Sequence, residues 1–266
     1  MTIPTYFLVI SVALCIALFW VVRRAEQLYF SREITLDLSL IIMVVGFLGS
    51  RLFHVLYESP TYYQQNWLRI FEVWNGGFVF YGGAVPATLL AIYWTAKKNQ
   101  GLYQGYLDLF APIGSFMYIS GRVACFLAGC CYGKHCDLPW AINGLHPTQL
   151  YAVFWELGTL VILLICERIP PNKRRPAFLG KSGCIFYLWM ALHSLGRLIM
   201  ELYRDDDRGP QWGLSISSWI SLIIFVLGIY FVVRKTPRPT NWMCANWLQP
   251  CNKSTPSPWP SAIYLI

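Results

Sequence analysis

Repeated apolar stretches, each about as long as a bilayer is thick, constrain the fold of this chain more than any other feature. A helix needs roughly 20 largely apolar residues to cross the hydrocarbon core of a membrane. Four stretches meet this length without interruption, at 3–22, 37–57, 183–202 and 214–234. Three more contain Gly, Pro or polar residues, at 76–96, 106–127 and 147–166. We therefore predict an all-α, polytopic membrane protein with about seven transmembrane helices.

The composition indicates a surface that faces lipid rather than water. Hydrophobic residues make up 56% of the chain and charged residues 13%, whereas a soluble domain carries roughly 25% charged residues. The formal net charge is +8, but the basic residues are concentrated in the breaks between apolar stretches, with no nucleic-acid-binding signature. We expect these basic residues to contact the anionic head groups of the lipid bilayer, and we expect no nucleic-acid partner.

The positions of the basic residues predict the orientation. Arg23 and Arg24 follow the first apolar stretch, Lys97 and Lys98 follow the third, and further basic residues follow the fifth and seventh. With seven helices these breaks share one side, which the positive-inside rule makes cytoplasmic. The N-terminus then lies outside and the C-terminus in the cytoplasm. We expect residues 1–235 to form the transmembrane domain and residues 236–266 to form a disordered cytoplasmic tail.

Ionisable residues near the end of the 183–202 stretch indicate an anion site. Arg197 and Glu201 are four residues apart and share one helix face, and Arg204 follows nearby. Two guanidinium groups beside one carboxylate leave a net positive charge, and the planar guanidinium suits phosphate oxygens. We predict a phospholipid head-group site here. The alternative is an ion-pair network that only fixes the packing of the helices.

A second motif runs from Gly121 to Gly133 and contains Arg122 and three cysteines, Cys125, Cys130 and Cys131. Together with Cys136 and two nearby histidines they could form a zinc site; a redox pair and small apolar packing are the alternatives. The spacing lacks a C-x2-C pair, and adjacent Cys130 and Cys131 are a rare pair of ligands for one tetrahedral ion. We favour packing and predict no metal site.

Two further motifs flank this one. His146 precedes Pro147 at the start of the fifth stretch, where Pro is tolerated in a first helical turn. Between Trp74 and Gly83, two glycine pairs, the second of them Gly82-Gly83, lead into the third stretch. They are typical of a broken or re-entrant helix that lines a cavity. A tight helix crossing would give the same pattern.

These motifs, in this order, resemble the prolipoprotein diacylglyceryl transferase family, from Tyr6 to about Lys235. The resemblance implies an enzyme of the bacterial inner (cytoplasmic) membrane. Its members transfer the diacylglyceryl group of phosphatidylglycerol to the lipobox cysteine that follows a prolipoprotein signal peptide, and glycerol phosphate leaves. It further implies that Arg122 and Arg197 are catalytic, that no cofactor is needed, and that the phospholipid contacts come from Tyr6, Arg51, Gly82, Gly83, Gly133, Glu201 and Arg204.

The chain departs from the family pattern at the expected base. Many members carry His-Gly-Gly where this chain reads Tyr81-Gly82-Gly83, and Cys125 and Cys130 stand where Asn and Glu are found. A tyrosine has an ordinary pKa of about 10 and is a weak base at neutral pH. We therefore name both Tyr81 and His146 as catalytic candidates.

Other functions remain open from the sequence. A related transferase could act on another lipid or acceptor. A lipid transporter or flippase would also explain charged residues in apolar helices, but it predicts internal repeats, which the chain lacks. A membrane thiol oxidoreductase would use Cys130 and Cys131, and its function would fail on loss of Cys130.

Overall fold

The structure is a computed structural model that describes residues 5–73, 76–98, 103–169, 182–204 and 215–234. Within these residues the chain is helical and has no strand, which confirms the predicted all-α class. The elements are α1 (Thr5–Gln27), α2 (Arg32–Phe53), the π-helical turn η1 (His54–Glu58), α3 (Pro60–Gln65), the 3-10 turn η2 (Trp67–Phe71), α4 (Phe80–Lys98), α5 (Tyr103–Leu127), α6 (Thr148–Arg168), α7 (Cys184–Glu201) and α8 (Ile216–Val233). The predicted tail, residues 236–266, lies outside the described residues.

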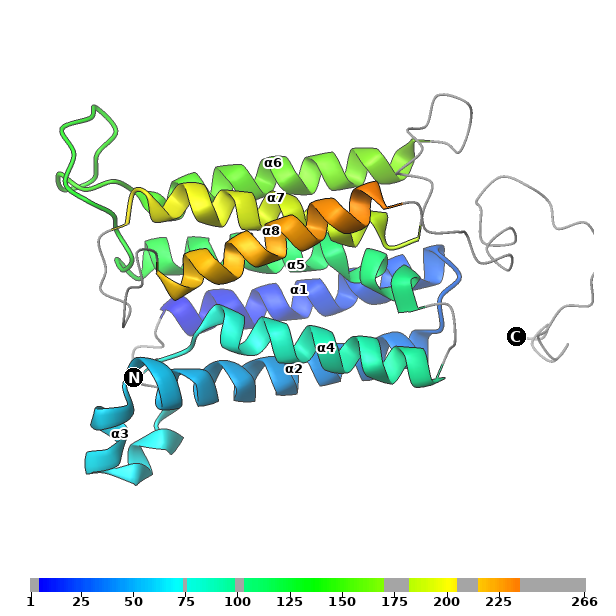
Figure 1. The fold of residues 1–266 in the computed structure, drawn as a ribbon, viewed down its shortest axis with the longest axis horizontal. Coiled ribbons are helices and arrows are strands. Elements are labelled where there is room, and N and C mark those ends of the chain that lie inside the picture. The colour runs from blue at the N-terminus through cyan, green and yellow to red at the C-terminus, as the bar shows by residue number, and fades with distance from the viewer. Residues whose placement is uncertain (1–4, 74–75, 99–102, 170–181, 205–214, 235–266) are drawn as a thin grey trace, which may run out of the picture.

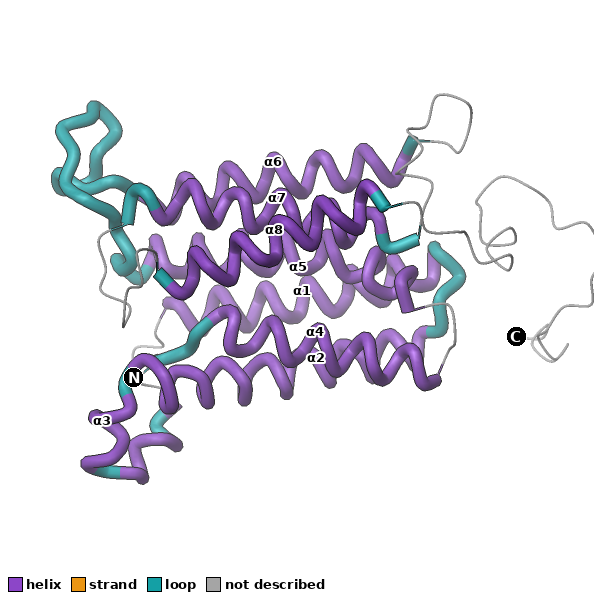
Figure 2. Tube along the Cα trace, in the orientation of Figure 1, coloured by secondary structure: helices purple, strands orange, loops and turns teal. Residues whose placement is uncertain are grey.

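The seven long helices lie side by side in one bundle and run up and down in turn (Figure 1). Each of the seven predicted apolar stretches coincides with one of these helices to within a few residues. Figure 2 shows that loops are confined to the two ends of the bundle. One end carries α3 and the loop 128–147, and we call it the loop end. The C-terminal ends of α1, α4, α6 and α8 gather at the opposite end, which we call the basic end.

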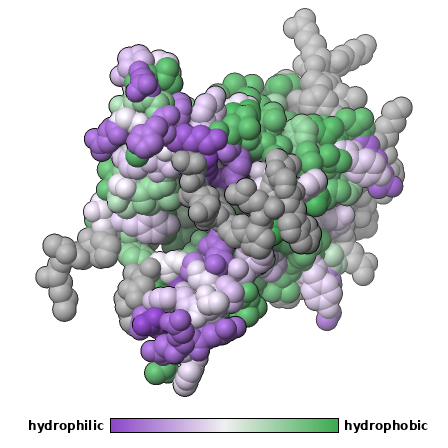
Figure 3. All heavy atoms as spheres, turned by 60° about the vertical axis from the view of Figure 1, so that its left-hand side comes forward, coloured by the Kyte–Doolittle hydropathy of each residue, from purple (hydrophilic) through white to green (hydrophobic). Residues whose placement is uncertain are grey.

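Five helices are long and apolar enough to cross a membrane: α1, α2 with η1, α5, α6 and α8. Each presents large apolar side chains to its surroundings, among them Phe19, Leu48, Phe154 and Val226, which are between 58% and 68% exposed. A broad apolar surface covers the flank of the bundle, while hydrophilic residues gather at the end that Figure 3 turns forward. Such an exposed apolar surface is typical of contact with lipid.

Glycines let α2 and α4 pack backbone to backbone. A Cβ atom added to Gly83 would lie 2.3 Å from the Gly46 carbonyl oxygen, and one added to Gly49 would lie 2.6 Å from the Gly82 oxygen. Small residues that allow such close approach are the usual means of helix association in lipid, where no hydrophobic force drives it. The pair Gly82-Gly83, in the first turn of α4, therefore serves the tight helix crossing that the sequence left open as an alternative.

Charged side chains inside the bundle pair with other groups. The Asp108 carboxylate of α5 accepts hydrogen bonds from the backbone N–H groups of Gly183 and Phe186, at 2.7 and 2.9 Å, and so caps the first turn of α7. Arg24 of α1 forms an ion pair with Glu167 of α6. These pairings compensate the loss of hydration that a charge suffers in a membrane.

Candidate functional site

Arg197 lies at the loop end of α7 and is 6% exposed. Its guanidinium donates a hydrogen bond to the Ser217 hydroxyl at 2.7 Å and lies 3.7 Å from the Glu201 carboxylate. The Ser215 hydroxyl donates to the same carboxylate at 2.6 Å. The i,i+4 spacing therefore forms an ion pair, and the first turn of α8 fixes it from the other side.

Tyr118 of α5 joins the two predicted catalytic arginines. The Arg122 guanidinium stacks on the Tyr118 ring, with 4.9 Å between its carbon and the ring centroid. The Tyr118 hydroxyl is within hydrogen-bonding reach of both Arg122 and Arg197. Tyr118 belongs to none of the motifs read from the sequence, because its role depends on the contact between α5 and α7. A cation-π partner four residues before Arg122 on the same helix was the only available signal.

Tyr81 faces the same group of side chains from α4. It is buried, its hydroxyl lies 2.8 Å from the Ser221 hydroxyl, and it is within hydrogen-bonding reach of Arg197. Two guanidinium groups and two tyrosine hydroxyls thus converge from α4, α5 and α7. Such a set of donors suits the oxygens of a phosphate.

Backbone pairing brings the loop 128–147 against the end of α7. Gly133 pairs with Arg204, and the Lys134 N–H donates to the Tyr203 carbonyl at 2.8 Å. A Cβ atom on Gly133 would lie 2.2 Å from that carbonyl oxygen, so only glycine fits here. Arg204 is 7% exposed, and its charge acts on Arg197. The pairing of Gly133 with Arg204 therefore fixes the loop; that both residues contact phospholipid stays a prediction.

His146 and Tyr6 lie at the edge of this arrangement. The His146 ring packs against Tyr203, with 5.2 Å between centroids, and its Nδ1 lies 3.2 Å from the Tyr151 hydroxyl. Tyr6 of α1 is close enough to Arg122 for their charges to interact. The fold thus places Tyr6 near Arg122 and His146 beside Tyr203 at the end of α7; their roles in the site stay predictions.

Three other residues predicted to contact phospholipid have structural roles instead. The Arg51 guanidinium donates to the main-chain carbonyls of Arg69, Ile70, Glu72, Gly76 and Gly77 and thereby holds the segment before α4. Its donors are taken, so it is not available to a phosphate. Gly82 and Gly83 pack against α2. All three contact a segment that folding brings beside them, and the sequence alone does not indicate these contacts.

A buried polar network behind the arginines escaped the sequence analysis. Glu156 of α6 is 1% exposed and accepts hydrogen bonds from Ser115 at 2.8 Å and Trp189 at 2.9 Å. His193 Nδ1 lies 2.9 Å from the other carboxylate oxygen. The His193 ring also packs edge-on against Tyr118, with 4.6 Å between centroids. The network therefore supports the tyrosine that joins the two arginines.

The cysteines at the end of α5 are not the apolar packing that we favoured. Cys130 is exposed, and Cys125 and Cys131 are half-buried, whereas a cysteine that only packs is usually buried. Hydrogen bonds from Cys125 and Cys130, with the charges of Arg204 and Arg122, lower the pKa of Cys131 to about 5. Burial raises the pKa of Cys130. Cys131 is therefore a thiolate at neutral pH.

The difference in pKa between Cys131 and Cys130 predicts selective alkylation of Cys131. The thiolate is the reactive form of a cysteine, so at pH 6 iodoacetamide should modify Cys131 before Cys130, although Cys130 is more exposed. The fraction modified at each site is read by peptide mass spectrometry after short exposures. Below pH 5 the Cys131 rate should fall, because its sulfur becomes protonated. Preferential modification of Cys130 at pH 6 would contradict the assignment.

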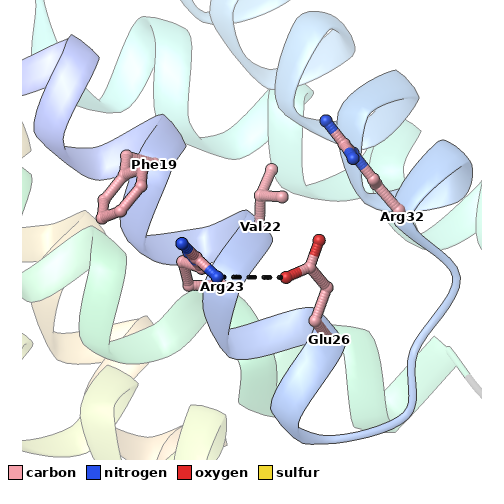
Figure 4. A pocket seen from close by; sticks show the side chains of 5 residues that line it. All are labelled: Phe19, Val22, Arg23, Glu26 and Arg32. Carbon is pink, nitrogen blue, oxygen red and sulfur yellow. Dashed lines mark ion pairs between the residues drawn. The ribbon is translucent and has the colours of Figure 1, made fainter.

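A hollow at the basic end is separate from this site. Phe19, Val22, Arg23, Glu26 and Arg32 line it, and Arg23 and Glu26 form an ion pair of 3.9 Å across it (Figure 4). It opens between α1 and the start of α2. None of the residues Tyr81, Tyr118, Arg122 and Arg197 lines it.

The fold and the site define a class: a helical membrane protein in which arginine and tyrosine side chains from several helices meet at one end of the bundle. The family model of prolipoprotein diacylglyceryl transferase matches residues 1–234. The chain belongs to this family.

Similar proteins carry the corresponding name. The chain is 33% identical over 199 residues to the phosphatidylglycerol–prolipoprotein diacylglyceryl transferase of Polynucleobacter asymbioticus, with 71% of this chain and 73% of the relative covered. It is 30% identical over 233 residues to that of Geobacter sulfurreducens, with 82% and 85% covered. It is 28% identical over 236 residues to that of Clostridium tetani, with 85% and 90% covered.

Proposed function

We propose that the chain transfers the diacylglyceryl group of phosphatidylglycerol to the cysteine thiol of a prolipoprotein. The observation that carries this proposal is the joint contact of Arg122 and Arg197 with Tyr118 inside an apolar bundle. A phosphodiester enters such a site with its acyl chains beside the lipid-facing helices and its phosphate among the arginines. The names of the similar proteins agree with this substrate pair.

The reaction is a displacement at carbon. The thiolate sulfur attacks the glyceryl carbon that carries the phosphate, a C–S bond forms, and the C–O bond to the phosphate breaks. Glycerol phosphate leaves with the electron pair and gains a second negative charge. In this proposal Arg122 and Arg197 stabilise this charge as it develops, and Arg204 adds a third cation. Tyr81, whose hydroxyl is near Arg197, is assigned a hydrogen bond to a phosphate oxygen.

His146 is the group to which we assign the thiol proton. It lies at the loop end, beside the strand-like pairing that carries Arg204, and its imidazole is half-buried. Imidazole is the side chain best suited to accept a proton near neutral pH. The orientation follows from the same reaction: we propose that the loop end faces outward, where a secreted precursor emerges, and that the basic end is cytoplasmic. All seven long helices then cross the bacterial inner membrane.

Replacement of this base should change the pH profile. His146→Asn should lower the transfer rate by about 100-fold at pH 7, with little change in the KM for phospholipid. The defect should shrink above pH 8.5, because the substrate thiol then ionises without a base. Rates are measured with a reporter precursor in vesicles from pH 6 to 9. A defect of equal size at every pH would mean that His146 serves only to fix the loop.

The transfer itself is tested in bacteria depleted of their own diacylglyceryl transferase. Expression of this chain should add the mass of one diacylglyceryl group to a reporter prolipoprotein, and a reporter with Ser in place of the lipobox Cys should stay unmodified. If the chain is folded in the membrane and the reporter gains no mass, the proposed substrate pair is wrong. A radiolabelled lipid that crosses vesicle membranes without chemical change would instead favour a flippase.

A further inference from the structure

Three thiols meet at the loop end of α5. Cys125 belongs to the last turn of this helix, and Cys130 and Cys131 follow in the turn beyond it. All three sulfur atoms lie within 4.8 Å of one another, and the sulfurs of Cys130 and Cys131 are 3.5 Å apart. The proposed transfer reaction uses none of these thiols.

We propose that these three cysteines bind one soft metal ion with a filled d shell, such as Zn²⁺ or Cu⁺. Thiolates bind these ions at a metal–sulfur distance of about 2.3 Å, which corresponds to sulfur–sulfur distances of about 3.8–4.0 Å for tetrahedral or trigonal ligands. The observed spacing lies close to these values. Small side-chain movements would therefore complete a three-sulfur site and leave a fourth position for water.

The turn makes neighbouring cysteines share one side. In an extended chain, adjacent side chains point to opposite faces, which is why adjacent Cys130 and Cys131 seemed unsuited to one ion. Cys131, however, has a positive φ of 67°, and Gly129 has a φ of 69°. A non-glycine residue in this region is strained and persists only where its surroundings hold it. Here the turn reverses the usual alternation and brings both thiols toward Cys125.

The next helix holds this turn. The Thr148 hydroxyl donates to the Cys131 carbonyl at 2.8 Å, and the Gln149 side-chain amide donates to the Cys130 carbonyl. Gln149 is fully buried. Both cysteine carbonyls are therefore fixed by the first turn of α6, and the thiols are oriented before any ion arrives. Pre-oriented ligands with a supporting second layer are what a metal site requires.

A disulfide accounts for the cluster less well. It would join two of the sulfurs at about 2.05 Å. The third thiol, although it also lies within 4.8 Å of the other two, would then have no function. A metal ion uses all three.

The charges fit a metal–thiolate group. Three thiolates around Zn²⁺ carry a net charge of −1, and the charges of Arg122 and Arg204 act on Cys131. The same arginines are those assigned to the phosphate. Resting on the proposed function, we therefore expect metal binding to compete with phospholipid and to slow the transfer.

Binding is tested without reference to activity. The reduced, purified chain in lipid nanodiscs is titrated with Cd²⁺, whose thiolate complexes absorb in the ultraviolet. One ion per chain should bind at pH 7 and release protons, because thiolates are the form of cysteine that binds a metal. Zn²⁺ should displace the signal. Cys130→Ser should weaken binding by at least 10-fold, and Cys15→Ser, a thiol on the lipid-facing side of α1, should leave it unchanged.

Activity forms the second arm. Zn²⁺ should slow the transfer by wild-type protein, a chelator should reverse this, and Cys130→Ser should transfer at the wild-type rate but resist Zn²⁺. No absorbance change in the wild-type titration, or an equal change in Cys130→Ser, would overturn the site. A clear titration with an unaffected transfer rate would overturn the competition. Absence of transfer under all conditions, with the titration intact, would overturn the proposed function and not the metal site.

Discussion

Arg197→Ala should lower the rate of diacylglyceryl transfer by about 1000-fold, because it removes a preorganised cation from the place where the leaving phosphate gains charge. The side chain is buried and pairs with Ser217 and Glu201. Arg197→Lys keeps one positive charge but loses the planar pair of donors. We expect this variant to retain more activity than the alanine variant and still to fall about 10-fold below wild type.

The measurement is the initial rate of reporter lipidation in vesicles of phosphatidylglycerol. Arg23→Ala is the matched control, since Arg23 is exposed and lies at the basic end beside Glu26. Its rate should match that of wild type. Thermal unfolding of each variant in detergent separates lost catalysis from lost folding. A folded Arg197→Ala protein with a rate within threefold of wild type would remove Arg197 from the proposed mechanism.

Glu156→Ala should lower the free energy of unfolding by about 3–5 kcal/mol, because it leaves buried hydrogen-bonding groups without their partner. Ser115, Trp189 and His193 all bond to this one carboxylate. The loss should also weaken the support of Tyr118, which packs on His193. Activity should therefore fall even in conditions where most molecules are folded.

Denaturation in mixed micelles measures this effect. Glu156→Gln keeps an oxygen acceptor and should lose only about 1–3 kcal/mol. Leu157→Ala is the matched control on the same helix, because Leu157 is 45% exposed and faces lipid; its change should stay within about 0.5 kcal/mol. If Glu156→Ala is as stable as Leu157→Ala, the network contributes nothing to stability.

Much of the site could be chosen from the sequence because charge is costly in a membrane. Arg122, Arg197 and Glu201 stand out in apolar stretches, where a side chain that only fills space would be apolar. Tyr118 could not be chosen in this way, because an aromatic residue is ordinary in an apolar helix. Glu156 carries the same signal as the arginines, since it lies in the 147–166 stretch, but the sequence analysis overlooked it; its partners on α5 and α7 appear only in the structure. Arg51 also stands out by its charge, but its guanidinium donates to main-chain carbonyls of the segment before α4 and not to a phosphate.

The sequence by itself determined the class of fold, because the length of an apolar helix is set by the thickness of the bilayer and can be read along the chain. It also determined the family, through motifs that keep their order. Only the tertiary structure decided which of the unusual residues meet. Helix contacts place Tyr118 between two arginines and Gly82 against α2, and a left-handed residue at Cys131 turns three thiols toward one point. Such contacts join residues far apart in the chain, and no local pattern records them.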